Sequence, residues 1–88
     1  MEQECAVDVI AVYSAAGEIR PLRFRMQDET EGIVKVNIDE IIGTKTVPYV
    51  GIEAQIFLCR GSVAGRIRVF ELKYLIRNHS WRLCRCIM

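Results

Sequence analysis

The sequence is poor in histidine, tryptophan and proline, and it lacks the long apolar runs that span membranes. It has one histidine, one tryptophan and two prolines among 88 residues. Its longest uninterrupted apolar runs cover only residues 9–13 and 56–59, whereas a membrane-spanning helix needs about 20 apolar residues. The first residues are acidic, where a secretory signal is basic. We therefore expect a cytoplasmic protein without a membrane segment.

His79 is the single histidine and therefore the single candidate for the base of a cysteine–histidine catalytic pair. A cysteine nucleophile would have to be Cys59 or Cys84, with His79 as the base. Cysteines within strands are usually small buried hydrophobic residues, and His79 lies in a predicted turn. Residues 61–65 also lack the Gly-Lys-Ser/Thr ending of a phosphate-binding loop. The sequence therefore predicts a non-enzymatic protein with no catalytic residue and no cofactor.

Cysteine is comparatively plentiful, at Cys5, Cys59, Cys84 and Cys86. Without a secretory signal, we expect reduced thiols rather than disulfides. Four cysteines and one histidine reach the ligand number of structural zinc, and Cys84 and Cys86 would share one face of a strand. The usual C-x-x-C pair is missing, and Cys5 and Cys59 are each alone in the sequence. The sequence thus predicts no metal site, with zinc as the less favoured alternative.

Alternating apolar and polar residues dominate the rest of the chain. In residues 22–26 (Leu-Arg-Phe-Arg-Met) every second side chain is apolar, which is typical of a strand with one buried face. Turn-forming clusters at 14–17, 28–32, 43–51, 61–65 and 77–80 separate strand-length runs at 5–13, 18–26, 33–41, 52–59, 66–75 and 80–87. This spacing predicts one all-β domain over residues 1–88, built as a small antiparallel barrel or a highly curved sheet of about six strands.

The phase of each run predicts the core and two irregularities. Pro21 cannot donate a ladder hydrogen bond, so its strand should be an edge or should bulge there, and a phase change near Val69 predicts a second bulge. The barrel should open at these two places. As alternatives, residues 39–43 could form one helical turn and residues 71–77 a short helix. The expected core consists of Leu22, Phe24, Val34, Val36, Ile38, Ile56, Leu58, Phe70, Leu72, Trp81 and Leu83.

Several segments resemble a family of short uncharacterised bacterial proteins, mainly from Clostridia and related Firmicutes. The likeness rests on Val12-Tyr13, Gly17 with residues 19–25, residues 70–74 (Phe-Glu-Leu-Lys-Tyr) and Trp81-x-Leu83. These are strand and turn patterns rather than catalytic signatures. The resemblance implies a compact β-rich cytosolic domain and supplies no activity and no site residue.

Charge is unevenly distributed along the chain. Residues 1–40 contain nine acids and four bases, whereas residues 41–88 contain two acids and eight bases. Cross-strand pairing of opposite charges is the simplest explanation. Small β-barrels also bind nucleic acid with basic side chains and exposed aromatic rings. The candidates here are Arg23, Arg25, Lys35 and Arg82 for the basic side chains, and Phe57, Tyr49 and Tyr13 for the rings.

Two runs are apolar on both faces, which favours association with another protein. Ile10 and Val12 lie opposite in phase to Val9 and Ala11, and Phe57 and Cys59 lie opposite in phase to the expected core of their strand. Such a strand is either central or presents an apolar patch to a partner, which could be a second copy of the chain. The sequence therefore predicts a protein-interaction or binding module, with nucleic-acid binding through Arg23, Arg25 and Lys35 as the alternative.

Overall fold

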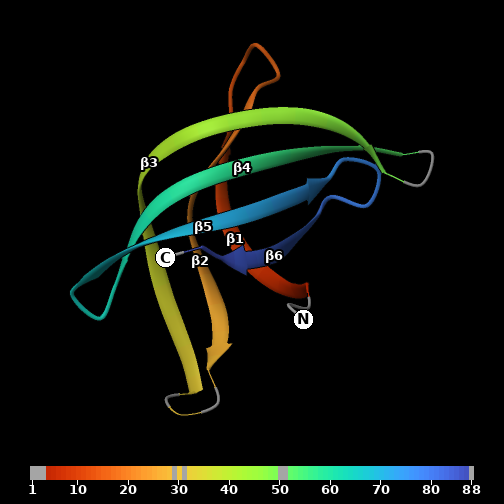
Figure 1. Cartoon of the computed structure of the whole chain (residues 1–88). Helices are drawn as coiled ribbons and strands as arrows, with labels where there is room; N and C mark the ends of the chain where they lie inside the picture. Colours follow the sequence, from red (N-terminus) through yellow and green to blue (C-terminus); the bar gives the residue numbers. More distant parts are fainter. Residues whose placement is uncertain (1–3, 29, 31, 50–51, 88) are drawn as a thin grey trace.

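Six antiparallel strands form a closed barrel in the computed structural model, which describes residues 4–28, 30, 32–49 and 52–87. Each strand pairs with the next along the chain, and β6 pairs back with β1 (Figure 1). The strands are β1 (Cys5–Tyr13), β2 (Ile19–Asp28), β3 (Gly32–Tyr49), β4 (Ile52–Val63), β5 (Arg66–Leu75) and β6 (Ser80–Cys86). The predicted small all-β barrel is confirmed. No helix in the described part of the chain is long and apolar enough to cross a membrane.

Aromatic side chains fill the centre of the barrel. Phe24 of β2 meets Phe70 of β5 edge to face, with ring centroids 5.3 Å apart, an arrangement that aromatic pairs prefer. Trp81 of β6 lies between Phe57 and Tyr74, with centroid separations of 5.6 and 4.8 Å. The expected core is confirmed at six positions and is half-buried at Val34 and Ile38. The six buried positions are Phe24, Val36, Phe70, Leu72, Trp81 and Leu83.

The irregularity predicted at Pro21 is present, but it moves Leu22 out of the core. Arg23 lies opposite Ile10 of β1, and Pro21 lies opposite Ala11. Leu22 is therefore the extra residue of a β-bulge, and the phase of β2 reverses there. Pro21 is buried, and Leu22 remains 39% exposed. The prediction of a buried Leu22 was wrong. It placed an irregularity at Pro21 correctly, but it did not take into account that the bulge turns the neighbouring side chain of Leu22 outward.

Over residues 56–59, strand β4 has the opposite phase to the one predicted. Phe57 and Cys59 are buried at 2% and 0% exposure and belong to the central cluster, whereas Ile56 and Leu58 are only half-buried. Both faces of this strand are apolar, so alternation alone could not distinguish the inner face from the outer one. Ala54, of the same parity as Ile56, is fully buried. The expected core places of Ile56 and Leu58 were therefore wrong.

Strand β3 is much longer than predicted. It continues through the expected turn at 43–51 as far as Tyr49, and positions 50 and 51 lie outside the described residues. Two register shifts against β4, at Asp39 and Ile42, replace the helical turn considered for residues 39–43. Bulges of this kind bend a strand and increase its twist, and β3 arches with β4 across the molecule (Figure 1). Gly43 and Pro48 are thus accommodated within a bent strand.

The second predicted bulge is on a different strand. Strand β5 pairs with β4 without interruption from Arg66 to Leu75, so Val69 is not bulged, and residues 71–75 are strand rather than helix. The register shift lies against β6, where Glu71 is opposite Arg85 and Leu72 is opposite Leu83. Cys84 is the extra residue. The apparent phase change near Val69 arises because Ile67 simply faces solvent, at 69% exposure.

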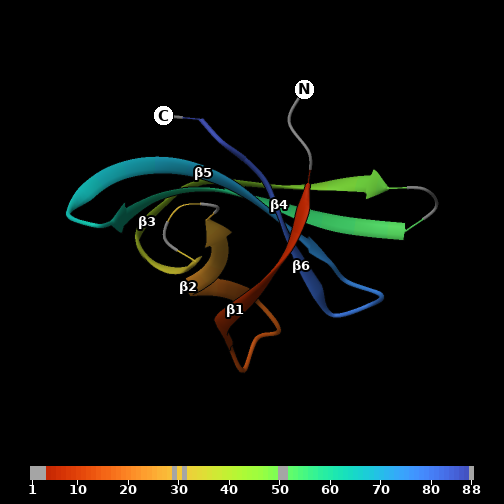
Figure 2. The same cartoon turned by 90° about the horizontal axis from the view of Figure 1, so that it is seen from below.

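The barrel closes along a short seam. Strands β1 and β6 are paired only through Cys5–Leu83, Ala6–Arg82 and Val7–Trp81. Beyond this seam, the β1–β2 hairpin projects away from β6, as the view from below shows (Figure 2). Strand β2 likewise pairs with β3 only from Arg23 to Asp28. The barrel is therefore most open around this hairpin, which contains Pro21, one of the two predicted places, and it is not open at Val69, the other.

Candidate functional site

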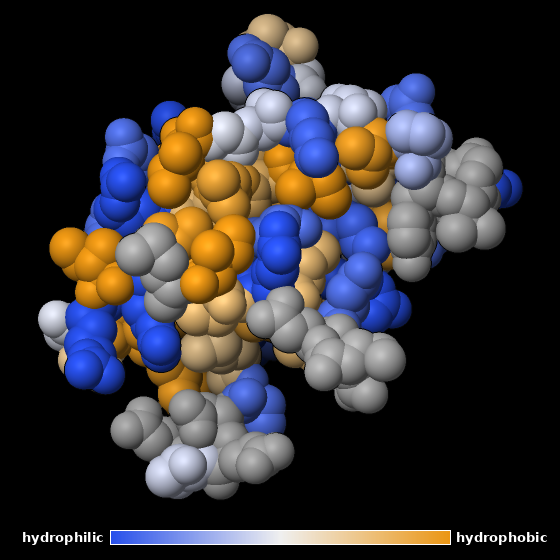
Figure 3. All heavy atoms as spheres, viewed as in Figure 1, coloured by the Kyte–Doolittle hydropathy of each residue, from blue (hydrophilic) through white to orange (hydrophobic). Residues whose placement is uncertain are grey.

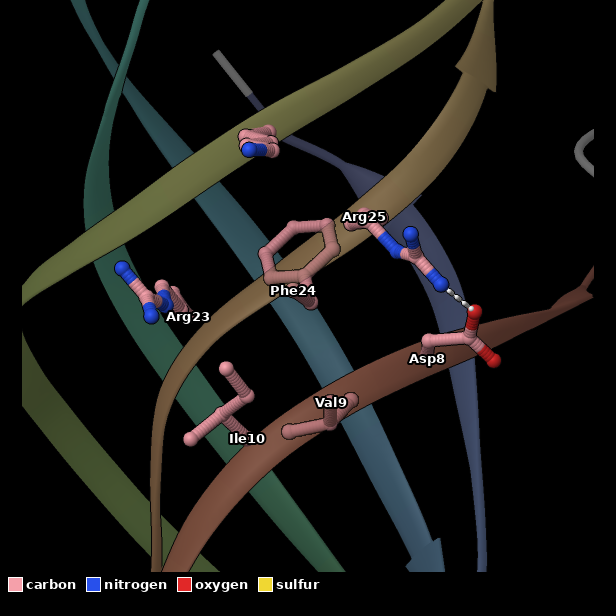
Figure 4. A pocket seen from close by; sticks show the side chains of 7 residues that line it. Asp8, Val9, Ile10, Arg23, Phe24 and Arg25 are labelled. Atoms are coloured by element: carbon pink, nitrogen blue, oxygen red, sulfur yellow. Dashed lines mark hydrogen bonds and ion pairs between the residues drawn. The ribbon is translucent and has the colours of Figure 1, made fainter.

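Three of the four predicted basic residues line one hollow on the outer face of β1, β2 and β3. The hollow has a volume of about 310 Å³, and we call it the basic hollow. Arg23 and Arg25 alternate with the buried Phe24 along β2, and Lys35 lies directly opposite Arg25 on β3. Figure 4 shows the two arginines on either side of Phe24, with Arg25 reaching Asp8 and with Ile10 and Val9 on the neighbouring strand β1. The residues that line the basic hollow are Asp8, Val9, Ile10, Arg23, Phe24, Arg25 and Lys35.

Positive charge in the basic hollow is only partly neutralised. The Nη2 atom of Arg25 donates to Oδ2 of Asp8 at 2.5 Å, with both side chains largely exposed. Within the described residues, Arg23 and Lys35 have no hydrogen bond or ion pair. Like charges directly opposite each other weaken strand pairing, so the pairing of Arg25 with Lys35 carries a cost that a bound anion would remove. The hollow is thus suited to a negatively charged group.

Exposed apolar side chains continue the basic hollow along the β1–β2 hairpin. Ile10 and Val12 of β1 are 51% and 40% exposed, and Leu22 lies beside them because of the bulge in β2. Ile10 also lines the hollow itself. This face therefore combines cations with accessible hydrocarbon, a combination that suits a peptide better than a simple ion.

The aromatic rings that nucleic-acid binding needs are missing from this face among the described side chains. Phe57 is buried in the core, contrary to its prediction as an exposed candidate. Tyr13 is exposed, but its hydroxyl lies 3.4 Å from that of Tyr74, at the end of β1 away from the arginines. The side chain of Tyr49 lies outside the described set. Base stacking has no platform beside Arg23 and Arg25 in this arrangement.

Arg82, the fourth predicted basic residue, does not line the basic hollow. It lies opposite Ala6 and Lys73 on the outer face of β6. Its neighbour Lys73 is buried at 4% exposure, although it faces outward, and its Nζ atom donates to Oε2 of Glu4 at 2.8 Å. A buried lysine is retained when it is paired. The sequence analysis missed this site because alternation places Lys73 on an outer face and gives no sign that the face is covered.

A second hollow, of about 320 Å³, lies on the outer face of β3, β4 and β5. Ile56, Leu58 and Ile87 give it an apolar lining, and the Glu71–Arg85 ion pair at 3.1 Å lies at its rim. Figure 3 shows apolar side chains gathered over β4 and β5 with separate charged groups between them. Since Glu71 neutralises Arg85 and leaves Lys45 as its one further cation among the described lining residues, this hollow has less to offer a negatively charged ligand than the basic hollow.

The cysteines and the histidine do not form a catalytic arrangement with one another. The Nδ1 atom of His79 lies 2.8 Å from the hydroxyl of Tyr74, and no hydrogen bond joins His79 to Cys59 or Cys84. Burial raises the pKa of the Cys59 thiol to about 12. Burial, together with the negative charge of Glu4, raises the pKa of Cys84 to about 11 against the opposing effect of Lys73. Both thiols therefore remain protonated at neutral pH and are weak nucleophiles.

The bulge at Cys84 also changes the relation between the last two cysteines. Cys86 lies opposite the core residue Phe70, whereas Cys84 is the extra residue before Arg85, next to Glu71 on the outer side. The expectation that both sulfurs share one strand face was therefore wrong, since it assumed a regular strand. No group of three or more His, Cys, Asp or Glu side chains in the described ranges could hold a metal ion. None of the four cysteines forms a disulfide within the described residues.

Comparison of the chain with protein-family models, with curated proteins and with solved structures finds no match. The resemblance to short clostridial proteins consequently remains a prediction. The function is therefore inferred from the geometry of the outer surface of the barrel.

Proposed function

We propose that the protein is a non-enzymatic binding module of the bacterial cytoplasm that recognises an acidic, partly apolar segment of another protein. The binding surface is the basic hollow together with Ile10, Val12 and Leu22. The observation that carries the proposal is that Arg23, Arg25 and Lys35 line one hollow together with the exposed Ile10. Four cysteines without a disulfide among the described residues are in keeping with a reducing compartment.

The chemistry of the surface favours a carboxylate-bearing peptide. The planar guanidinium of Arg23 can hold a carboxylate through two parallel hydrogen bonds. Ile10 and Leu22 would contact apolar side chains on either side of that carboxylate. Because the cations are exposed and the hollow is small, we expect a weak, salt-sensitive and transient interaction.

Nucleic-acid binding through the same three cations is the second candidate. The basic hollow supports it, since phosphates also bind arginine and lysine. One feature of the face argues for the peptide instead, since it has no exposed aromatic ring among its described residues.

The test compares two labelled probes by fluorescence anisotropy at low salt. One is a short peptide of alternating glutamate and leucine, and the other is an oligothymidylate of similar charge. We expect the peptide to bind more tightly than the oligothymidylate. The double variant Arg23→Ala with Lys35→Ala should weaken peptide binding by about tenfold, because it removes the two cations of the hollow that have no partner among the described residues.

The matched control removes two exposed arginines from elsewhere on the barrel, Arg66→Ala with Arg77→Ala. It has the same net charge as the test variant, so a general electrostatic attraction would weaken equally in both. Equal losses in the two double variants would contradict the proposal. Tighter binding of the oligothymidylate, abolished only in the Arg23/Lys35 variant, would establish the nucleic-acid alternative.

A further inference from the structure

Strand β1 has a free edge beyond the seam of the barrel. Its pairing with β6 ends at Val7, and residues 8–13 continue with β2 on one side only. Among the described strands, only β2 and β6 lie beside β1. An edge of this kind presents main-chain N–H and C=O groups that can pair with another strand.

The free edge of β1 lacks the devices that usually prevent strand pairing. Natural edge strands carry proline, lysine or a bulge, and the free part of β2 has Arg20, Pro21 and the bulge at Leu22. In contrast, residues 9–13 read Val-Ile-Ala-Val-Tyr, with no charge, glycine or proline. The register shift between the two strands leaves its extra residue on β2, so β1 itself remains regular.

The outer side chains of this edge form an apolar row that can complement itself. Ile10 and Val12 point outward at 51% and 40% exposure, with Asp8 before them as the charged residue of the strand. In an antiparallel pairing centred on Ala11, each Ile10 faces the Val12 of a second copy. Asp8 then lies opposite Ser14, so that no like charges meet across the axis.

We propose that two copies of the chain associate edge to edge through residues 8–13 of β1, antiparallel about a two-fold axis at Ala11. The contact extends the sheet across both barrels by strand addition. It also covers the exposed row of Ile10 and Val12 with the same row of the second copy, as an isologous interface requires. This interface shares Ile10 and Val12 with the surface proposed for the peptide, so dimer formation and peptide binding would compete for these side chains, and each is tested by its own assay.

The experiment is sedimentation velocity of the full chain from about 1 µM to about 1 mM, the range expected for a small interface. The wild type should change from monomer to dimer as its concentration rises. Val12→Lys places a cation opposite Ile10 of the second copy, twice in each dimer, and should raise the dissociation constant at least about tenfold. Both positions are exposed, so the barrel should fold normally, as far-UV circular dichroism would verify.

A mixture of variants tests the register itself. Ile10→Glu and Val12→Lys should each be monomeric alone and should dimerise when mixed, because the new carboxylate and ammonium face each other only when Ile10 lies opposite Val12. Ile67→Lys is the matched control, since it places the same charge at an apolar position on β5 that is 69% exposed. It should leave the dimer intact.

Three results would overturn the proposal. The first is a wild type that stays monomeric across the whole range. The second is a dimer that Val12→Lys does not weaken, or that Ile67→Lys weakens to the same extent. The third is failure of the mixture to dimerise although the wild type does, since this would refute the pairing about Ala11.

Discussion

A single methyl group added at Gly61 should destabilise the barrel measurably. Gly61 is buried in β4, opposite Ile38 of β3 and Arg68 of β5. A Cβ atom at this position would lie 2.8 Å from the backbone oxygen of Asn37 and 3.0 Å from Cγ1 of Val36. The first contact is shorter than real Cβ atoms tolerate, and its partner is backbone within a sheet, which cannot rotate away.

The expected cost follows from the kind of atoms that must move. Val36 is fully buried, so its methyl group has no free space to enter. Overpacking of a core in this way typically costs 1–3 kcal/mol, and we expect about 2 kcal/mol for Gly61→Ala. In a domain of this size, that loss corresponds to a fall in Tm of roughly 8–16 °C.

Urea unfolding followed by the fluorescence of Trp81 provides the assay, because this tryptophan is buried between Phe57 and Tyr74. With a slope near 1 kcal/mol/M, the midpoint of Gly61→Ala should fall by about 2 M. Gly43→Ala is the control, since nothing lies within 4 Å of the added atom at that position in β3. Its free energy of unfolding should change by no more than about 0.5 kcal/mol. If the two variants prove equally stable, the close packing of β3 against β4 at Gly61 is refuted.

Other substitutions test the turns, the core and the buried thiol. Ala64 and Gly65 both have positive φ, 50° and 77°, in the β4–β5 turn. Because asparagine tolerates positive φ better than alanine, Ala64→Asn should raise the unfolding free energy by about 0.5–1 kcal/mol in the same urea assay. A decrease would contradict this turn geometry. Leu22→Ser should change the unfolding free energy by less than about 0.5 kcal/mol, whereas Phe24→Ala should lower it by about 3 kcal/mol or more. Similar losses in the two variants would mean that Leu22 is not on the outside. Above pH 9 the unfolded Cys59 thiol ionises while the folded thiol keeps its proton until about pH 12, so the unfolding free energy should fall as the pH rises, by up to about 1.4 kcal/mol per pH unit. The fall should be shallower in Cys59→Ala, and parallel pH profiles would show that this thiol is not buried.

The predictions from sequence succeeded where one face of a strand is polar. In β2 and β3 the alternation of Phe24 with Arg23 and Arg25, and of Val36 with Lys35, correctly placed both the core and the cations. The polar side chains determine which face is outside, because burying an unpaired charge is costly. The basic hollow could be anticipated for the same reason.

The predictions failed where both faces are apolar or where a bulge changes the phase. For β4, Ile56 and Phe57 are equally apolar neighbours, and the inward place of Phe57 depends on its contacts with Leu72 and Trp81 of other strands. A bulge is recognisable from proline, as at Pro21, but has no sequence signal at Cys84. The burial of Lys73 depends on Glu4, far away in the sequence, and pattern analysis within one strand cannot detect such contacts.

The short seam between β1 and β6 has a consequence for the order in which the protein folds. All other pairings join strands that are neighbours in the chain and can form as hairpins, whereas the seam joins the two ends of the sequence. Closing the largest loop costs the most chain entropy, so the seam should form after the transition state for folding. Weakening the Val7–Trp81 contact would then speed unfolding and leave the folding rate almost unchanged. The barrel is in this sense a meander that assembles locally and closes last.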